Sequence, residues 1–256
     1  MAFKGIGGFL NSPGMIPWEI VVIYFIVAGV FAIIYGRSHG AGPKFNTVDL
    51  VYIGVGAAFT TVWEFFVGPF LDKFVPAGAA AYIGFGFFGR ILIVLIVAGL
   101  VRKVGTGMLS LFIFNLLGDI FHYGFSGEPI YTIYETLTYG LFIDLMIAIT
   151  HGHLFGIGSG EENEDATGKA VKGNRLTNFL SKYTMVAPAV MGGVIGFLWA
   201  IPDNILYTGF FSPFLYGGIV NWQSIIFSFG ASIPGNIVFG IIAAFIAVRV
   251  SKVLGQ

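Results

Sequence analysis

Seven long apolar segments set the limits on what this chain of 256 residues can fold into. A helix needs about 20 apolar residues to cross the hydrocarbon core of a bilayer. Segments of this kind lie at about 16–36, 48–68, 78–101, 105–124, 129–149, 184–207 and 223–250. Only 10% of the residues are charged and 56% are hydrophobic, whereas a soluble domain carries roughly a quarter charged residues. The sequence therefore predicts an all-α, polytopic integral membrane protein, and it excludes a soluble enzyme and a disordered chain.

The remaining composition excludes several classes of function. The net charge is +0, so the chain has no overall basic surface for nucleic acid. Without cysteine it has no disulfide, no thiolate metal site and no cysteine nucleophile. The G-x-G-x-x-G run at 84–89 lies inside an apolar segment, and His151 and His153 lack a third metal ligand. We therefore expect no catalytic residue, no metal and no cofactor, and any ATP-driven step must come from another subunit.

The basic residues predict an orientation in the membrane. With the N-terminus outside, the inner segments hold ten basic residues: Arg37, Lys44, Arg102, Lys103, Lys169, Lys172, Arg175, Lys182, Arg249 and Lys252. The outer segments hold only Lys4 and Lys73. Because cytoplasmic loops carry an excess of Lys and Arg, we predict a multi-pass protein of the cell membrane. Its N-terminus is expected outside and its C-terminus in the cytoplasm.

The chain is expected to divide into two parts. Residues 1–44 would form an additional N-terminal transmembrane helix and a loop, and residues 45–256 a six-helix membrane bundle. The polar stretch at about 150–183 holds an acidic run at 161–165, followed by basic residues. We expect a flexible cytoplasmic linker there, since the spacing of a calcium-binding loop is absent.

Ionisable residues within the predicted spans point to a polar cavity that opens to the outside. Such residues are costly in a membrane and usually mark a pathway or a site. By their position along the spans, Glu64, Asp119, His122 and Glu135 lie in the outer half of the membrane. Aromatic residues lie at the same depth, among them Trp63 and Tyr134. The inner half is nearly bare of ionisable residues except for Asp144.

Arg90 lies near the middle of the third span, where an isolated cation would be expensive. We expect a carboxylate partner, and Glu135 and Glu64 are nearest in depth. The pair is either a structural contact between helices or part of a ligand site. We predict a ligand site formed by Trp63, Glu64, Arg90, Asp119, His122, Tyr134 and Glu135. Carboxylates and aromatic rings favour a cationic or donor-rich ring, such as thiamine or its pyrimidine precursor.

Two pairs of small residues could let helices approach closely. Gly54 and Ala58 are four residues apart on the second span, and Gly192 and Gly196 on the sixth. Such spacing is consistent both with packing inside the chain and with contact to another protein.

Residues 45 to 254 resemble the substrate-binding S component of energy-coupling factor (ECF) transporters. The resemblance lies in six helices and in the small residues Gly54, Ala57 and Ala58 on the first of them. It also lies in the basic hairpin at 102–107, the segment Asn115-Leu116-Leu117-Gly118-Asp119, and the last helix from Ser232 to Arg249. An additional N-terminal helix and a longer linker distinguish this chain from that pattern.

The resemblance implies a specific function. An S component captures a vitamin or related micronutrient on the outer side of the membrane. It then docks through small residues of its first helix onto a transmembrane coupling subunit, which carries two ATPases. By this resemblance Gly54, Ala57 and Ala58 would form the docking surface.

Two other functions are consistent with the same residues. An autonomous, proton-coupled secondary transporter could use Glu64, Asp119, Glu135 or Asp144, and would be expected to show an inverted internal repeat. An intramembrane enzyme could use His122 with Asp119 or Glu135, and would need a further converging ligand or nucleophile. The sequence shows neither of these additional features.

Overall fold

The computed structural model describes residues 14–76, 79, 84–124, 129–158 and 185–254, and all regular structure in these ranges is helical. Four of its elements are π-helical segments, labelled η2, η4, η5 and η7, and η6 is a short 3₁₀ helix. The elements in chain order are α1 (Trp18–Ser38), α2 (Thr47–Val62), η2 (Trp63–Val67), α3 (Gly68–Asp72), α4 (Phe85–Val101), α5 (Thr106–Gly118), η4 (Asp119–Tyr123), α6 (Pro129–Glu135), η5 (Thr136–Gly140), α7 (Leu141–Ile149), η6 (Leu154–Gly156), α9 (Val186–Ala200), η7 (Ile201–Phe211), α10 (Ser212–Tyr216) and α11 (Trp222–Val253).

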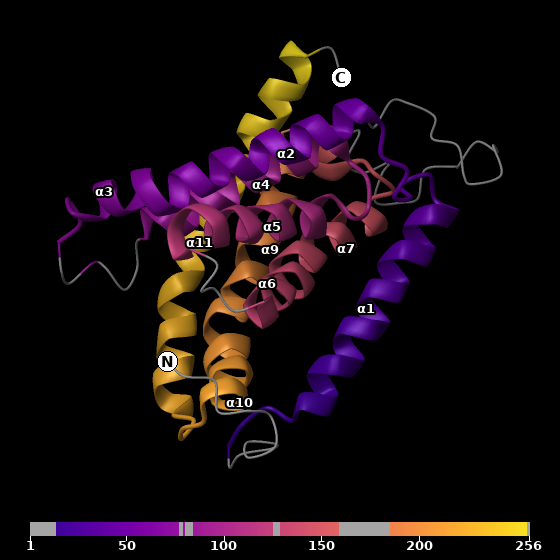
Figure 1. Ribbon diagram of the computed structural model, residues 1–256. Helices are drawn as coiled ribbons and strands as arrows, with labels where there is room; N and C mark the ends of the chain where they lie inside the picture. The colour runs from indigo at the N-terminus through magenta and orange to yellow at the C-terminus, as the bar shows by residue number, and fades with distance from the viewer. Residues whose placement is uncertain (1–13, 77–78, 80–83, 125–128, 159–184, 255–256) are drawn as a thin grey trace.

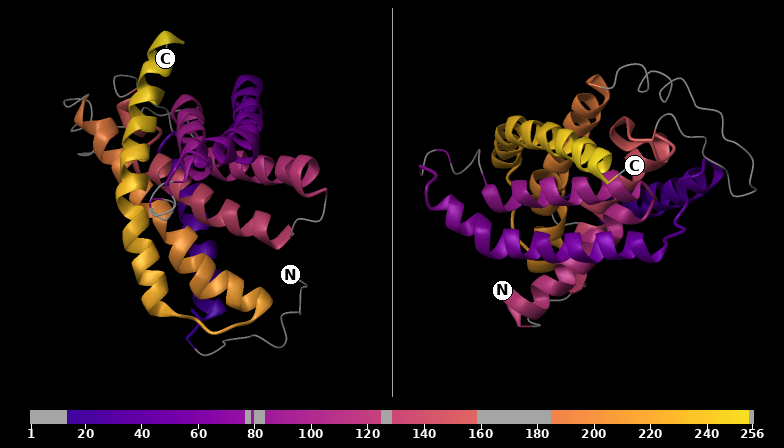
Figure 2. Two further views of the ribbon diagram at one scale, coloured as in Figure 1. Left: turned by 90° about the vertical axis from the view of Figure 1, so that its left-hand side faces the viewer. Right: turned by 90° about the horizontal axis from the view of Figure 1, so that it is seen from above.

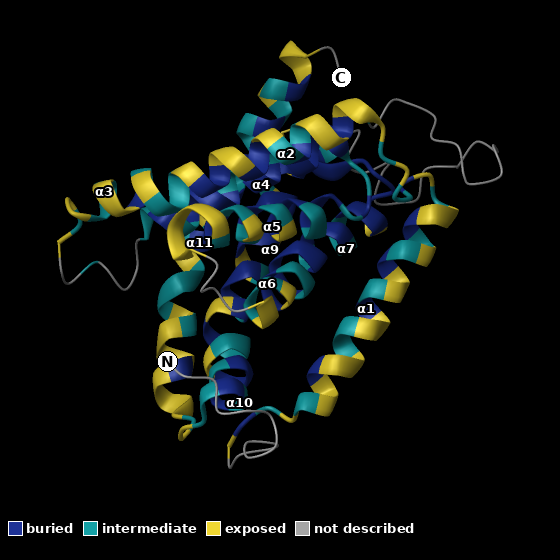
Figure 3. Cartoon of the chain, in the orientation of Figure 1, coloured by how far each residue is buried: buried dark blue, intermediate teal, exposed yellow. Residues whose placement is uncertain are grey.

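Five continuous helices in the described part of the chain are long and apolar enough to cross a membrane. They are Trp18–Ser38, Thr47–Asp72, Pro129–Ile149, Val186–Tyr216 and Trp222–Val253. Many large apolar residues on them are exposed, and Figure 3 shows exposed residues along these helices. An apolar exterior of this extent fits a lipid environment, so the chain is an all-α, multi-pass membrane protein. The helix Phe85–Val101 is apolar but shorter, and the expected total of seven spans stays a prediction.

The turns that follow α1 and α4 meet each other and mark one end of the helices α1, α2, α4 and α5. At this end, the Val104 N–H donates to the Ala41 carbonyl, and Lys103 pairs with Asp49. We call this the basic end, after Arg37, Lys44, Arg102 and Lys103. The opposite end is called the acidic end, after Glu64, Asp119, Glu135 and Asp203. Which side of a membrane each end faces stays a prediction, and Lys4 and the basic residues at 169–182 lie outside the described residues.

Two groups of helices cross each other between these ends. Figure 1 shows α2, α4 and α5 running across the molecule, with α9 and α11 crossing them and α1 at one edge. Helix α2 packs on α4 and α5, whereas α11 packs on α9 and α4. Seen from above in Figure 2, α2 and α4 lie next to each other, and α11 lies on the other side of α4. The core between these layers includes Ile91, Leu95, Leu111, Ile147 and Trp199, all buried.

Glycine permits the closest of these helix crossings. A Cβ on Gly240 of α11 would overlap the Gly192 carbonyl of α9, and one on Gly196 would overlap the Asn236 carbonyl. The Gly192 and Gly196 pair therefore serves packing inside the chain. A Cβ on Gly54 of α2, by contrast, would meet nothing within 4 Å. Gly54 is thus not required for internal packing.

Buried carboxylates accept backbone N–H groups at the start of two of the helices. The Asn46 side chain accepts the Asp49 N–H, while Asp49 accepts the Asn46 N–H, which forms a capping box at the start of α2. At the start of α5, the two oxygens of Asp144 accept the N–H groups of Gly107 and Met108, at 2.9 and 3.0 Å. Asp144 on α7 therefore ties α7 to α5 as a structural residue.

Helix α1 packs mainly on α7, and its C-terminal end contacts the turn that follows α7. The His39 and His151 rings stack with centroids 4.1 Å apart, and the Tyr35 hydroxyl lies 3.2 Å from Nε2 of His151. Burial, together with the nearby His39 and His153, lowers the pKa of His151 to about 4. The His151 ring is therefore neutral near pH 7, so the stacked pair avoids the repulsion of two imidazolium ions.

The first residues assigned to the predicted linker belong to the folded core. Residues 150–158 form a turn and η6, and Leu154 and Phe155 are buried in the core. The expected start at about residue 150 is therefore too early, because this turn closes the basic end of the core. Residues 159–183, with the acidic run, lie outside the described residues.

We predict that Gly240→Ala destabilises the protein by about 1–3 kcal/mol, because the added methyl forces α9 and α11 apart. Gly54→Ala is the matched control and should be neutral or slightly stabilising, since alanine is the better helix former. Thermal unfolding in detergent micelles measures both. Equal stability of the two variants would contradict the proposed close contact.

Candidate functional site

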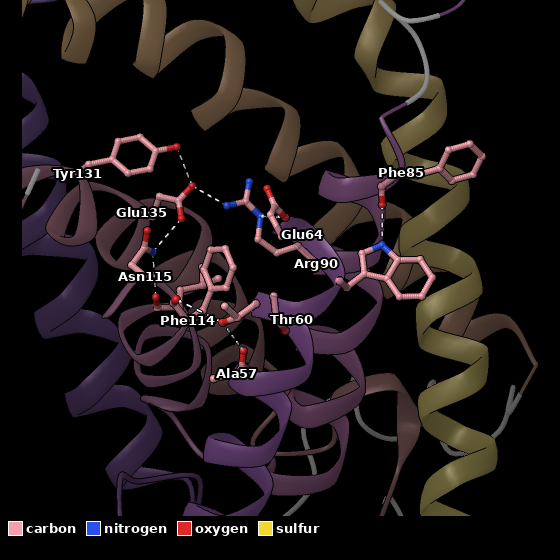
Figure 4. A network of polar contacts seen from close by, with 12 residues as sticks. Ala57, Thr60, Glu64, Phe85, Arg90, Phe114, Asn115, Tyr131 and Glu135 are labelled. Carbon is pink, nitrogen blue, oxygen red and sulfur yellow. Dashed lines mark hydrogen bonds and ion pairs between the residues drawn. The ribbon is translucent and has the colours of Figure 1, made fainter. Parts of the chain in front are cut away.

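A buried arginine with two carboxylates lies at the centre of the acidic end. Nη1 of Arg90, on α4, donates to Oε1 of Glu135 on α6 at 2.6 Å. Nε of Arg90 lies 3.4 Å from Oε2 of Glu64 on η2. Figure 4 shows the guanidinium group between the two carboxylates. The expected carboxylate partner of Arg90 is therefore present, and a second one lies beside it.

Glu135 is held by three donors. Oε1 also accepts the Tyr131 hydroxyl at 2.9 Å, and Oε2 accepts Nδ2 of Asn115 at 2.8 Å (Figure 4). The Glu135 side chain is 0% exposed. Because a buried charge is tolerated only when it is paired and hydrogen-bonded, this network accounts for a carboxylate at this depth.

Aromatic rings surround the guanidinium group of Arg90. Its central carbon lies 5.0 Å from the Phe87 ring centroid, 5.4 Å from that of Phe114 and 5.3 Å from that of Tyr139. These distances are within the range of cation–π attraction. The rings come from α4, α5 and η5, so the orientation of the guanidinium is fixed by three parts of the chain.

Glu64 is held less firmly than Glu135. Its side chain is 20% exposed, and its buried Oε2 atom makes no hydrogen bond within the described part of the chain. Nε of Arg90 also makes no hydrogen bond to a described residue, and Arg90 is only 6% exposed. Asp203 on η7 also lies within electrostatic reach of Arg90. Three carboxyl groups therefore lie near the single positive charge of Arg90.

Two of the predicted aromatic site residues have structural partners. Nε1 of Trp63 donates to the Phe85 carbonyl at 2.7 Å, and the indole packs so closely on Gly89 that a Cβ there would overlap it. The Tyr134 hydroxyl donates to the Pro202 carbonyl at 2.6 Å. Both residues therefore build the wall of the site with their donors already in use.

Neither Asp119 nor His122 forms an ion pair with Arg90 among the described residues. Both belong to η4, and the exposed His122 ring stacks on Phe65 with centroids 4.5 Å apart. Asp119 is half-buried and forms no ion pair with any described residue. The described residues also hold no group of three or more His, Cys, Asp or Glu suited to a metal ion.

Four π-helical segments accompany the polar residues of the acidic end. Glu64 lies in η2, Asp119 and His122 in η4, and Asp203 in η7, while Glu135 directly precedes η5. π-helical turns are rare in proteins, and those that occur often lie at functional sites. Their coincidence with the ionisable residues on four helices supports a functional role for this end.

Sequence reasoning missed several members of the site. Asn115, Phe87, Phe114 and Tyr139 contact the charged groups and were not predicted as site residues. An amide within an apolar span is itself a signal, and it would have found Asn115. The aromatic residues carry no such signal, because phenylalanine is abundant throughout this chain, with 28 copies.

The predicted docking residues do not share one surface. Ala57 is only 1% exposed and packs in the core, so it cannot meet a partner in this conformation. Ala58 is exposed, and Gly54 is half-buried with open space beside it. Ala58 lines a shallow apolar groove of about 330 Å³ between α2 and α5, with Val62, Phe66 and Leu117 among the lining residues.

Comparison of the chain with protein-family models, with curated proteins and with solved structures finds no match.

We predict that the two glutamates differ in their effect on stability. Glu135→Gln should cost about 3–5 kcal/mol, because it leaves Arg90 short of its buried counter-ion and sets an amide donor against Asn115. Glu64→Gln should cost on the order of 1 kcal/mol, since Glu64 makes no hydrogen bond to Arg90. Thermal unfolding in detergent measures both, and a larger loss for Glu64→Gln would contradict this division of roles.

Proposed function

We propose that this chain is a membrane-embedded solute-capture subunit that binds a small polar solute at the acidic end. The observation that carries the proposal is the Arg90 cluster, in which Glu135 is fully paired while Glu64 and Nε of Arg90 keep hydrogen-bonding capacity. An intramembrane group that is both costly and incompletely paired is expected to have a function. We expect the acidic end to face the outside of the cell and the basic end the cytoplasm.

The resemblance to S components of ECF transporters supports a more specific proposal. The chain would deliver a vitamin or vitamin precursor, such as a thiamine-like ring, to a transmembrane coupling subunit with two ATPases. Gly54 and Ala58 support this proposal, because internal packing does not use them. The role of Asp144 as a cap of α5 weakens the alternative of proton coupling through that residue.

Native mass spectrometry of the protein, purified in mild detergent from its own cells, tests solute capture. We expect a non-covalently bound small molecule, and Glu64→Gln should lower its retention at least about tenfold, as for the loss of a charge-assisted hydrogen bond. Glu19→Gln on α1 is the control and should retain the molecule. Absence of any bound solute, or equal retention in both variants, would contradict the proposal.

Association with a coupling subunit is tested by Ala58→Trp. The indole would project from the exposed face of α2 and should abolish co-purification with a coexpressed coupling subunit, while thermal stability is kept. Phe59→Trp is the matched control, because Phe59 is 64% exposed on the same helix and is already aromatic. Undisturbed association of the Ala58→Trp variant would rule out this docking surface.

A further inference from the structure

The Arg90 cluster consists of a satisfied half and an unsatisfied half. On the satisfied side, Glu135 accepts from Arg90, Tyr131 and Asn115. On the other side, Nε of Arg90 and Oε2 of Glu64 form an ion pair at 3.4 Å, and neither of these buried atoms makes a hydrogen bond to any described residue. A buried polar atom without a hydrogen bond is costly. A bound molecule that forms hydrogen bonds with both atoms would recover this free energy.

The two unsatisfied atoms differ in chemistry. Nε–H of Arg90 is a donor with a fixed direction, because Glu135 and the Phe87, Phe114 and Tyr139 rings hold the guanidinium. The Glu64 carboxylate only accepts, and its 20% exposed side chain can turn aside to admit a ligand. A ligand that complements this pair carries a hydrogen-bond acceptor next to a hydrogen-bond donor along one edge.

Simpler ligands satisfy the pair less well. A cation without an acceptor would bind Glu64 and leave Nε of Arg90 unpaired. An anion would pair with Nε, but Glu64, Glu135 and Asp203 would repel it. A neutral or cationic ring with adjacent acceptor and donor atoms meets both requirements.

We propose that Nε of Arg90 and the carboxylate of Glu64 together recognise one edge of the solute through hydrogen bonds. A carbonyl oxygen or ring nitrogen of the solute accepts from Nε–H, and a neighbouring N–H of the solute donates to Glu64. The ligand class is therefore a cyclic amide, a cyclic urea or an amino-substituted nitrogen heterocycle. This inference rests on the proposed function and narrows its solute.

Matched pairs of small probes test this edge. The probes 2-pyridone and 2-aminopyridine carry an acceptor beside an N–H donor, whereas N-methyl-2-pyridone and 2-dimethylaminopyridine keep the acceptor and lack the donor. Binding is measured from the rise of the unfolding temperature of the detergent-solubilised protein with probe concentration. We expect the unmethylated member of each pair to bind at least about tenfold more tightly.

Variants connect the discrimination to the two residues. Glu64→Leu removes the acceptor and should abolish the difference within each pair, whereas Glu19→Gln should preserve it. Equal binding of methylated and unmethylated probes by the unchanged protein, or no binding by any of them up to their solubility, would overturn the proposed edge. Discrimination that persists in Glu64→Leu would overturn it as well.

The results of the two experiments together distinguish a failure of this inference from a failure of the proposed function. If a solute co-purifies in a Glu64-dependent manner but the probe pairs are not distinguished, solute capture stands and the edge is wrong. If the pairs are distinguished through Glu64 but no solute co-purifies, the edge stands and solute capture fails.

Discussion

The charge on Arg90 is the constraint on which the acidic end depends. A guanidinium group within a membrane bundle is costly unless carboxylates and hydrogen bonds compensate it. Compensation requires Glu135 from α6, Asn115 from α5 and Glu64 from η2, so three further parts of the chain must converge on α4. The Arg90 cluster thus specifies which helices become neighbours. The apolar surfaces of these helices would allow several other arrangements.

Close helix contacts make this convergence possible. Gly89 admits the Trp63 indole between η2 and α4, and Gly107 packs against Gly140 where α5 meets η5. Larger residues at these positions would move the helices that carry Glu64 and Glu135 away from Arg90. Small residues therefore promote helix association in this protein, as hydrophobic burial does in water. Apolar contact alone provides little driving force for helices to associate in lipid.

The sequence predicted the helices well and the site in part. Hydropathy placed Pro129–Ile149 to the residue, because lipid requires long apolar segments and the turns between them are polar. It misplaced the start of the linker, since Leu154 and Phe155 are core residues in a turn that follows a span. The cost of an intramembrane charge identified Arg90, Glu64 and Glu135. The burial of Ala57 depends on the rotation of α2 about its axis, which spacing alone does not fix, and the π-helical segments had no recognisable sequence pattern.

The four π-helical segments give the two ends of the molecule different tolerance to evolutionary change. A π-turn closes over one more residue than an α-turn, so gaining or losing a single residue can convert one into the other without ending the helix. At the acidic end, insertions and deletions can thus rotate side chains such as Glu64 and Asp203 relative to Arg90. At the basic end, Asp144 and the capping box of α2 fix where α5 and α2 begin, so single-residue insertions and deletions are not accommodated there in this way. Such changes could thereby alter the surroundings of Arg90 while the architecture of the basic end remained unaltered.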